Sequence, residues 1–139
     1  MKIIFLALSV MLSAGLAAQK QDKDPEISAY VKLVSKDSLK ANVEKLVSFG
    51  TRHTMSSTTD DRKGIGAARN WVLSKFRNYA QNAGGRMEVF LQNEDLEPDG
   101  KRINKATNLG NAIAILKGTD PTDKRIIIIS GHLDSRVSD

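Results

Sequence analysis

Apolar residues recur at helical spacing in three stretches of the chain. They are Ile27, Tyr30, Val31 and Val34 in the first stretch, Leu39, Val43, Leu46 and Val47 in the second, and Ile65, Ala68, Val72, Phe76 and Tyr79 in the third. A period of three to four residues is typical of a helix with one apolar face. Glycine often follows the end of a helix, and Gly50 follows the second stretch while Gly84 and Gly85 follow the third. We therefore predict two short helices that end at Gly50 and one longer helix that ends before Gly84.

The apolar period changes to two after these glycines. Met87, Val89 and Leu91 occupy alternate positions, as the residues on one face of a strand do. Residues 93–105 contain a Pro-Asp-Gly sequence that is typical of turns. Residues 112–116 are again apolar. We predict a strand at 87–92, a turn or hairpin tip, and a second strand at 112–116.

Four consecutive isoleucines, Ile126–Ile129, follow a polar turn at residues 119–124. A run of β-branched residues between turn signals is typical of a strand buried on both faces, as at the centre of an α/β sheet. Residues 51–64 are rich in hydroxyl and charged side chains, which favours an exposed connection. The pattern as a whole therefore predicts an α/β fold with the isoleucine run inside its sheet.

His132 and Asp134 come directly after this predicted strand. Two positions apart on an extended backbone, their side chains point to the same side. A neutral imidazole is a good zinc ligand, and a nearby carboxylate can accept the other ring proton. Ligands bind beyond the carboxyl ends of strands in open α/β sheets. The pair is thus a candidate metal site, and the alternative is a surface histidine at a polar strand end.

Other polar residues are weaker candidates. His53 lies in the polar connection without an acid cluster around it, so we expect it to be solvated. Ser135 as a nucleophile would need a histidine base held by a third group, and His132 is better explained as a ligand. Arg52, Arg136 and Ser135 could contact a substrate, but an ordinary surface role explains them better. The GIGAAR segment at 64–69 lacks a preceding strand and a third glycine, so helix packing explains it better than phosphate binding.

The N-terminus has the three parts of a secretory signal: Lys2, an apolar run from Ile3 to Leu12, and small residues up to Ala18. Cleavage could follow either Ala17 or Ala18. The run is shorter than the roughly 20 residues that cross a bilayer, which disfavours an uncleaved anchor. We predict a signal peptide at 1–18, a flexible leader at 19–25, and a protein exported to the periplasm or the extracellular space without a stable membrane anchor.

Composition narrows the function classes further. The chain has no cysteine, so it forms no disulfide and carries no lipid on a cysteine after the signal. Loss of Lys2 with the signal lowers the formal net charge from +5 to +4. Lysines and arginines alternate with acids and do not interleave with aromatic residues, so we predict no nucleic-acid partner.

Three segments together resemble a known family. They are GIGAARNWVLSKF at 64–76, NAIAILKG at 111–118 and RIIIISGHLDSR at 125–136. From Leu46 to Asp139 the chain resembles the N-terminal half of secreted zinc aminopeptidases, which include bacterial leucyl aminopeptidases and aminopeptidase Y. The histidine, any residue, aspartate, serine segment at 132–135 is the sharpest element of this resemblance.

The resemblance implies an α/β fold with helices flanking a mixed, largely parallel central sheet, of which residues 26–139 form the N-terminal part. It implies two zinc ions and a peptide or protein substrate. His132 would bind one zinc ion, and Asp134 would be the acid of the catalytic site that supports it without being a primary ligand. The family's other ligands and its general base come later in the chain, and Asp139 follows His132 too closely to be one of them. We therefore expect this chain to be a fragment that is inactive alone.

Three alternatives stay open at this stage. Zinc carboxypeptidases and deacylases also carry a GHLD segment, usually followed by an aliphatic residue where this chain has Ser135. Glutaminyl cyclases share the aminopeptidase fold and use a single zinc ion. A small secreted binding domain, in which His132 has no role, is the third alternative. The sequence leaves the oligomeric state and the substrate preference undefined.

Overall fold

The computed structural model describes residues 23–136 and contains helices and one hairpin. The elements are α2 (Pro25–Lys32), α3 (Lys36–Ser48), α4 (Gly64–Ala80), β1 (Met87–Leu96) and β2 (Thr107–Leu116). The chain divides into two compact units, residues 1–36 and 37–139, so α2 is separate from the unit that contains α4 and the hairpin. The predicted signal peptide and the start of the predicted leader lie outside the described residues.

Helix α2 begins at the end of the predicted leader. Asp24 is its N-cap, and the Asp24 carboxylate accepts a hydrogen bond from the backbone N–H of Glu26 at 2.8 Å. Pro25 occupies the first turn, where its missing N–H has no intrahelical partner to lose. No residue of α2 is buried. Among residues 23–136, no helix has both the length and the apolar content needed to span a bilayer.

The core of the larger unit is small and forms where α3 ends against the start of α4. Phe49, Ala67 and Ala68 are buried, and the partly buried Leu46, Trp71 and Leu133 pack around them. The Phe49 and Trp71 rings are 6.2 Å apart between centroids, with their planes tilted by 57°. The rest of the apolar stripe of α3 stays exposed. The helix prediction is therefore confirmed, while only one end of α3 finds a packing partner in the described structure.

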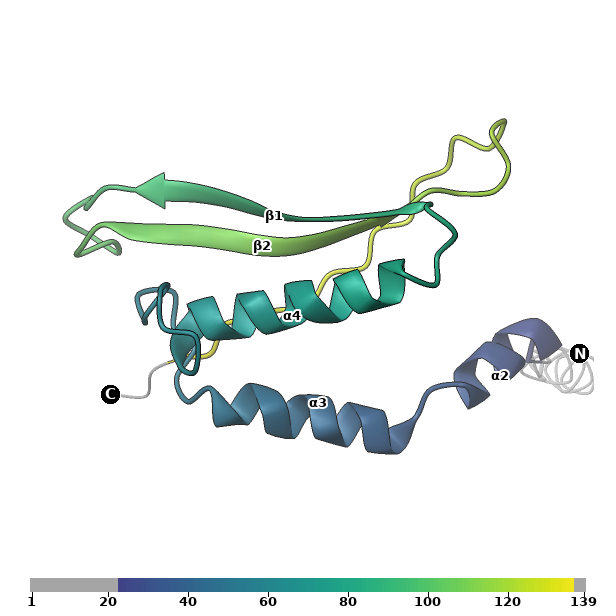
Figure 1. Ribbon diagram of the computed structural model, residues 1–139, viewed down its shortest axis with the longest axis horizontal. Helices are drawn as coiled ribbons and strands as arrows, with labels where there is room; N and C mark the ends of the chain where they lie inside the picture. The colour runs from purple at the N-terminus through teal and green to yellow at the C-terminus, as the bar shows by residue number, and fades with distance from the viewer. Residues whose placement is uncertain (1–22, 137–139) are drawn as a thin grey trace, which may run out of the picture. The chain divides into compact units, whose positions relative to one another are not determined.

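Helix α4 lies along one face of the hairpin (Figure 1). Met87, Val89 and Leu91 are half-buried while the residues between them are exposed, so the predicted alternation is confirmed. In β2, Ala114 pairs with Val89 and Ala112 pairs with Leu91, which places these small residues on the same face. Small side chains there allow the hairpin to approach the helix closely.

Arg69 lies inside this contact with an exposed fraction of 4%. Its Nη1 donates to the backbone carbonyl oxygen of Asn108 at 3.0 Å and to the Asn108 side-chain oxygen at 3.1 Å. Within the described residues its Nε has no hydrogen-bond partner. Burial lowers the pKa of the Arg69 guanidinium, because the charged form loses solvation. No sequence pattern indicated the burial of Arg69, since a lone arginine in a helix is usually exposed.

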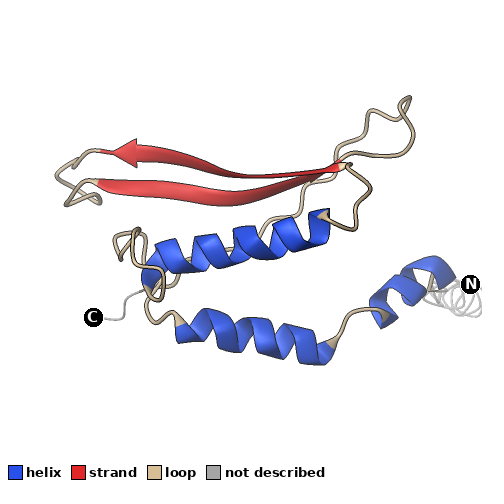
Figure 2. Ribbon diagram, in the orientation of Figure 1, coloured by secondary structure: helices blue, strands red, loops and turns tan. Residues whose placement is uncertain are grey.

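Both strands extend beyond their predicted ends. They form one hairpin (Figure 2) and pair in antiparallel register from Met87 opposite Leu116 to Leu96 opposite Thr107. Residues 93–96, predicted as part of the turn and polar except for Leu96, therefore belong to β1. Backbone pairing does not require apolar side chains, and the Asn108 amide also donates to the Asp95 carboxylate across the strands at 2.6 Å.

The predicted sheet is wrong in this structure. Helices flanking a mixed, largely parallel central sheet were expected, whereas residues 23–136 form one antiparallel pair of strands. The isoleucine run Ile126–Ile129 pairs with no strand, and its side chains are 84–93% exposed. A strand buried on both faces needs neighbouring strands and two covering layers. Within the described residues the hairpin pairs only with itself, so the isoleucines have neither.

The exposed isoleucine run leads to a prediction about solubility. Contiguous exposed apolar residues of high β propensity promote aggregation. Ile127→Lys with Ile129→Lys should reduce light scattering of the chain lacking residues 1–18 several-fold at equal concentration. The control, Thr119→Lys with Ser130→Lys, adds the same charge to exposed polar positions and should change scattering little. Equal improvement in both variants would show that net charge, and not the isoleucine run, controls aggregation.

Candidate metal site

The segment after the isoleucines is held from one side and exposed on the other. Leu133 and Ser135 are partly buried, whereas His132, Asp134 and Arg136 are exposed. The Leu133 side chain packs against the core cluster of Phe49, Ala67 and Ala68. Because side chains of an extended backbone alternate, anchoring Leu133 and Ser135 inward turns His132 and Asp134 outward together.

The structure brings His132 and Asp134 into direct contact. His132 Nδ1 lies 3.1 Å from the Asp134 carboxylate oxygen Oδ1, with the imidazole almost fully exposed and the carboxylate about half exposed. When Nδ1 carries the ring proton, it donates to this carboxylate. Nε2 of the exposed ring then has a free lone pair, which is the form in which an imidazole binds a metal.

Arg52 holds this segment in place. An ordinary surface role was expected for Arg52, and this prediction is wrong. Arg52 is partly buried and forms hydrogen bonds with residues more than 80 positions away in the sequence. Its Nε donates to the carbonyl oxygen of Leu133 at 3.0 Å, and its backbone N–H donates to Ser135 Oγ at 2.8 Å. Ser135 is therefore engaged as a hydrogen-bond acceptor. No local pattern indicated either contact.

The connection before α4, predicted as exposed, is partly buried at residues 52–56 and 58. It supplies hydrogen-bond acceptors to the first turn of α4: Ser56 Oγ accepts from the backbone N–H of Ile65 at 2.9 Å, and the Ser57 carbonyl accepts from that of Gly66 at 3.0 Å. A Cβ at Gly66 would collide with the backbone of Thr58. The helix-packing role predicted for the GIGAAR segment is thus confirmed.

Within this connection, the Asp60 carboxylate closes a turn. It accepts hydrogen bonds from the backbone N–H groups of Arg62 at 2.7 Å and Lys63 at 3.2 Å. The Arg62 bond is the main reason why the pKa of Asp60 lies below its ordinary value, because hydrogen bonds to the carboxylate favour its charged form. Asp60 therefore stabilises the turn as an anion and is engaged locally.

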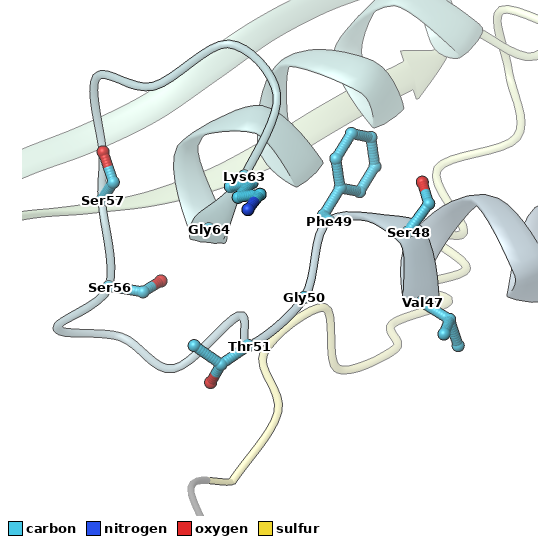
Figure 3. Close-up of a pocket in the computed structure, with 9 residues that line it drawn as sticks. All are labelled: Val47, Ser48, Phe49, Gly50, Thr51, Ser56, Ser57, Lys63 and Gly64. Carbon is cyan, nitrogen blue, oxygen red and sulfur yellow. The ribbon is translucent and has the colours of Figure 1, made fainter.

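A shallow cavity of about 420 Å³ lies where α3, the connection and α4 meet (Figure 3). Its lining comes from residues 47–51, Ser56, Ser57, Lys63 and Gly64. Hydroxyl groups and one lysine are its polar side chains, and the lining contributes neither a carboxylate nor an imidazole. The lining of this cavity therefore provides no carboxylate or imidazole that could bind a zinc ion together with His132.

His53 is engaged within the connection. Its Nδ1 accepts a hydrogen bond from the backbone N–H of Met55 at 3.1 Å, and the side chain is partly buried. The prediction of a solvated loop histidine is therefore wrong, although no acid cluster joins it. Across residues 23–136, no three histidine, aspartate or glutamate side chains are grouped so that they could hold a metal ion. A zinc site has three or four protein ligands, so the His132 and Asp134 pair is not a complete zinc site by itself.

Sequence comparison relates the chain to zinc metalloproteases. It is 42% identical over 90% of its length to a protein of Pyricularia oryzae named "probable zinc metalloprotease". Proteins with the same name from Leptosphaeria maculans and Phaeosphaeria nodorum are 38% and 41% identical over 90% and 91% of the chain. The aligned part makes up 24%, 28% and 25% of the three relatives, so the chain spans about a quarter of their length.

Two further comparisons found no match, one with protein-family models and one with solved structures. The relatives agree with the zinc metallopeptidase chemistry that the sequence predicted. Their names specify neither an aminopeptidase nor the number of zinc ions, and the three organisms are fungi. The aminopeptidase family and the two-zinc site therefore stay predictions.

Proposed function

We propose that this chain forms part of a zinc metallopeptidase that releases N-terminal residues from peptides. His132 is a ligand of one zinc ion through Nε2, and Asp134 accepts the Nδ1 proton and fixes the orientation of the ring. The observation that carries the proposal is the outward-facing pair at 3.1 Å on a segment anchored by Leu133 and Ser135.

The pair fits a zinc ion in its donor chemistry. An imidazole whose second nitrogen is bonded to a carboxylate is a common arrangement at zinc sites, since the carboxylate fixes the tautomer and makes the ligand more basic. The almost fully exposed ring leaves Nε2 accessible to a zinc ion that ligands from elsewhere in the protein would also bind. Bound zinc would polarise a peptide carbonyl and lower the pKa of a coordinated water.

The remaining ligands and the general base come from outside residues 23–136 in this proposal. One histidine and one supporting carboxylate do not complete a catalytic zinc site, which normally has three protein ligands and a water. The chain aligns with only about a quarter of each of its longer relatives, which supports the placement of the other ligands outside residues 23–136. A second zinc ion and the preference for N-terminal residues rest on the resemblance to secreted zinc aminopeptidases.

The proposed activity predicts a clear effect of metal removal. A protein of the relatives' full length that includes this chain should hydrolyse aminoacyl p-nitroanilides and lose at least about 100-fold in rate after dialysis against a zinc chelator, because zinc supplies both the Lewis acid and the activated water. Adding zinc back should restore the rate, while magnesium should not. Hydrolysis that survives complete zinc removal, checked by elemental analysis, would contradict the proposal.

Substrate choice separates the enzyme classes that share this chemistry. Release of the first residue from a free peptide, with no action on its N-acetylated form, is the result expected of an aminopeptidase. Release of the last residue would instead indicate a carboxypeptidase, and cyclisation of an N-terminal glutamine would indicate a glutaminyl cyclase. Full-length protein that binds zinc but transforms none of these substrates would favour a binding protein.

We also propose that the protein is exported. The support is the charged, apolar and small-residue succession before residue 19. Mass spectrometry of the protein recovered outside the cytoplasm should find a new N-terminus at residue 18 or 19. A cell-associated protein that retains Met1 would contradict export with cleavage.

A further inference from the structure

Arg52 joins the end of α3 to the segment that carries His132. Besides its bond to the Leu133 carbonyl, its guanidinium donates from Nη1 to the carbonyl oxygen of Leu46 at 2.5 Å and more weakly to that of Gly50 at 3.4 Å. All of these acceptors are backbone carbonyls. One planar guanidinium thus ties the C-terminal end of α3 to the residue between His132 and Asp134.

The backbones of Arg52 and Ser135 add a second tie. Besides the bond from the Arg52 N–H to Ser135 Oγ, the Ser135 N–H donates to the Arg52 carbonyl at 3.3 Å. Within the described structure, the hydrogen bonds that connect residues 132–135 to the rest of the unit all involve Arg52. Upstream, the exposed isoleucine run pairs with no strand among residues 23–136. The position of the segment therefore depends on Arg52 and on the packing of Leu133.

The hydrogen bonds that link the end of α3 to the Leu133 carbonyl require an arginine. Nε and Nη1 donate to two carbonyls that belong to different parts of the chain, and the rigid guanidinium fixes the angle between the two bonds. Lysine has a single ammonium on a flexible stem, so it could satisfy one carbonyl but not hold both in a fixed relation.

We propose that Arg52 is a positioning residue of the metal site. By binding the Leu133 carbonyl and Ser135, it holds the two inward-facing residues of the segment, so that His132 and Asp134 face outward together. This role rests on the proposed function, because it takes the pair as a zinc ligand and its supporting acid. Within residues 23–136, the hydrogen bonds of Arg52 go to other groups than the His132 and Asp134 side chains.

The test uses the full-length protein and two kinds of measurement. The variants are Arg52→Ala, Arg52→Lys and Ser135→Ala, and Arg62→Ala is the control because Arg62 is exposed in the same connection and removal of its charge leaves the tie intact. Hydrogen exchange of zinc-free protein reports on residues 130–136 without any metal. Competition with a chromophoric chelator reports on zinc affinity.

Arg52→Ala should increase hydrogen exchange at the Ser135 amide, which donates to the Arg52 carbonyl, about tenfold, as expected for the loss of hydrogen bonds that hold the segment. Zinc affinity should fall by about 10- to 100-fold, the range typical of residues that orient a ligand. Arg52→Lys should keep part of both properties, Ser135→Ala should show a smaller loss, and Arg62→Ala should match the parent protein. If Arg52→Ala unfolds the protein, the lysine and Ser135 variants carry the test.

Different experimental results would contradict the positioning role of Arg52 and the proposed zinc ligand. Unchanged exchange and unchanged zinc affinity in Arg52→Ala would overturn the positioning role. Faster exchange with unchanged zinc affinity would also overturn it, because the segment would then be held for structural reasons only. If instead His132→Ala leaves zinc affinity intact, the proposed zinc ligand is wrong, whatever the Arg52 variants show.

Discussion

Replacing His132 by alanine in the full-length protein is expected to reduce kcat/KM for a peptide substrate by more than about 100-fold. Loss of a residue that supports a zinc ligand typically costs about 10- to 100-fold, and loss of the ligand itself should exceed that range. Asp134→Asn should reduce kcat/KM by about 10- to 100-fold, since the asparagine amide can still contact the imidazole ring but carries no charge. Steady-state kinetics and zinc content measured on the same samples check both expectations.

His53→Ala is the matched control for this prediction. His53 is the other histidine of the chain, and its ring accepts a hydrogen bond from the Met55 backbone at a distance of 3.1 Å. Its removal should leave zinc content and kcat/KM close to the parent values. Equal losses in both variants would point to a general effect on folding. Full activity in His132→Ala would show that the His132 and Asp134 pair is not part of the catalytic zinc site.

Replacing Gly66 by alanine is expected to destabilise the chain by about 1–3 kcal/mol, the usual cost of forcing extra atoms into a packed site. In an isolated helix the same change is favourable by about 0.5–1 kcal/mol, because glycine is a poor helix former. The sign reverses here because the new Cβ would collide with the backbone of Thr58, which cannot rotate away as a side chain could. Urea unfolding of the chain lacking residues 1–18 measures the difference.

Asn70→Ala is the control for Gly66→Ala. Asn70 is exposed on the same helix, so alanine there should only improve helix propensity and stabilise by a few tenths of a kcal/mol. If both alanine variants stabilise the chain, the connection does not lie on the start of α4 as the structure has it.

Much of the local structure follows from the sequence. The spacing of Ile65, Ala68 and Val72 predicted α4, and the alternation after Gly85 predicted β1 with the correct inward face. The contact between His132 and Asp134 agrees with their two-residue spacing on an extended backbone. In each case the deciding residues lie within a few positions of one another, so backbone geometry alone relates them.

Burial could not be predicted in the same way. The four isoleucines have the composition of a buried strand, yet burial requires neighbouring strands that are remote in sequence, and the described residues provide none. Arg69 shows the opposite case: its charge suggested exposure, but the small residues of β2 leave room for its side chain beside Gly110. Both outcomes depend on partners that no local pattern encodes.

The sequence by itself determined the helices, the faces of β1 and the shared side of His132 and Asp134, because these depend on backbone periods. Only the tertiary structure decided that the strands form an antiparallel hairpin and that the backbone of Thr58 packs against Gly66. It alone also decided that Arg52 holds the segment bearing the candidate metal site. The bond from Arg52 to Ser135 joins residues 83 positions apart. Contacts of that range arise from the packing of whole elements, which is why the residue pattern around either partner did not reveal them.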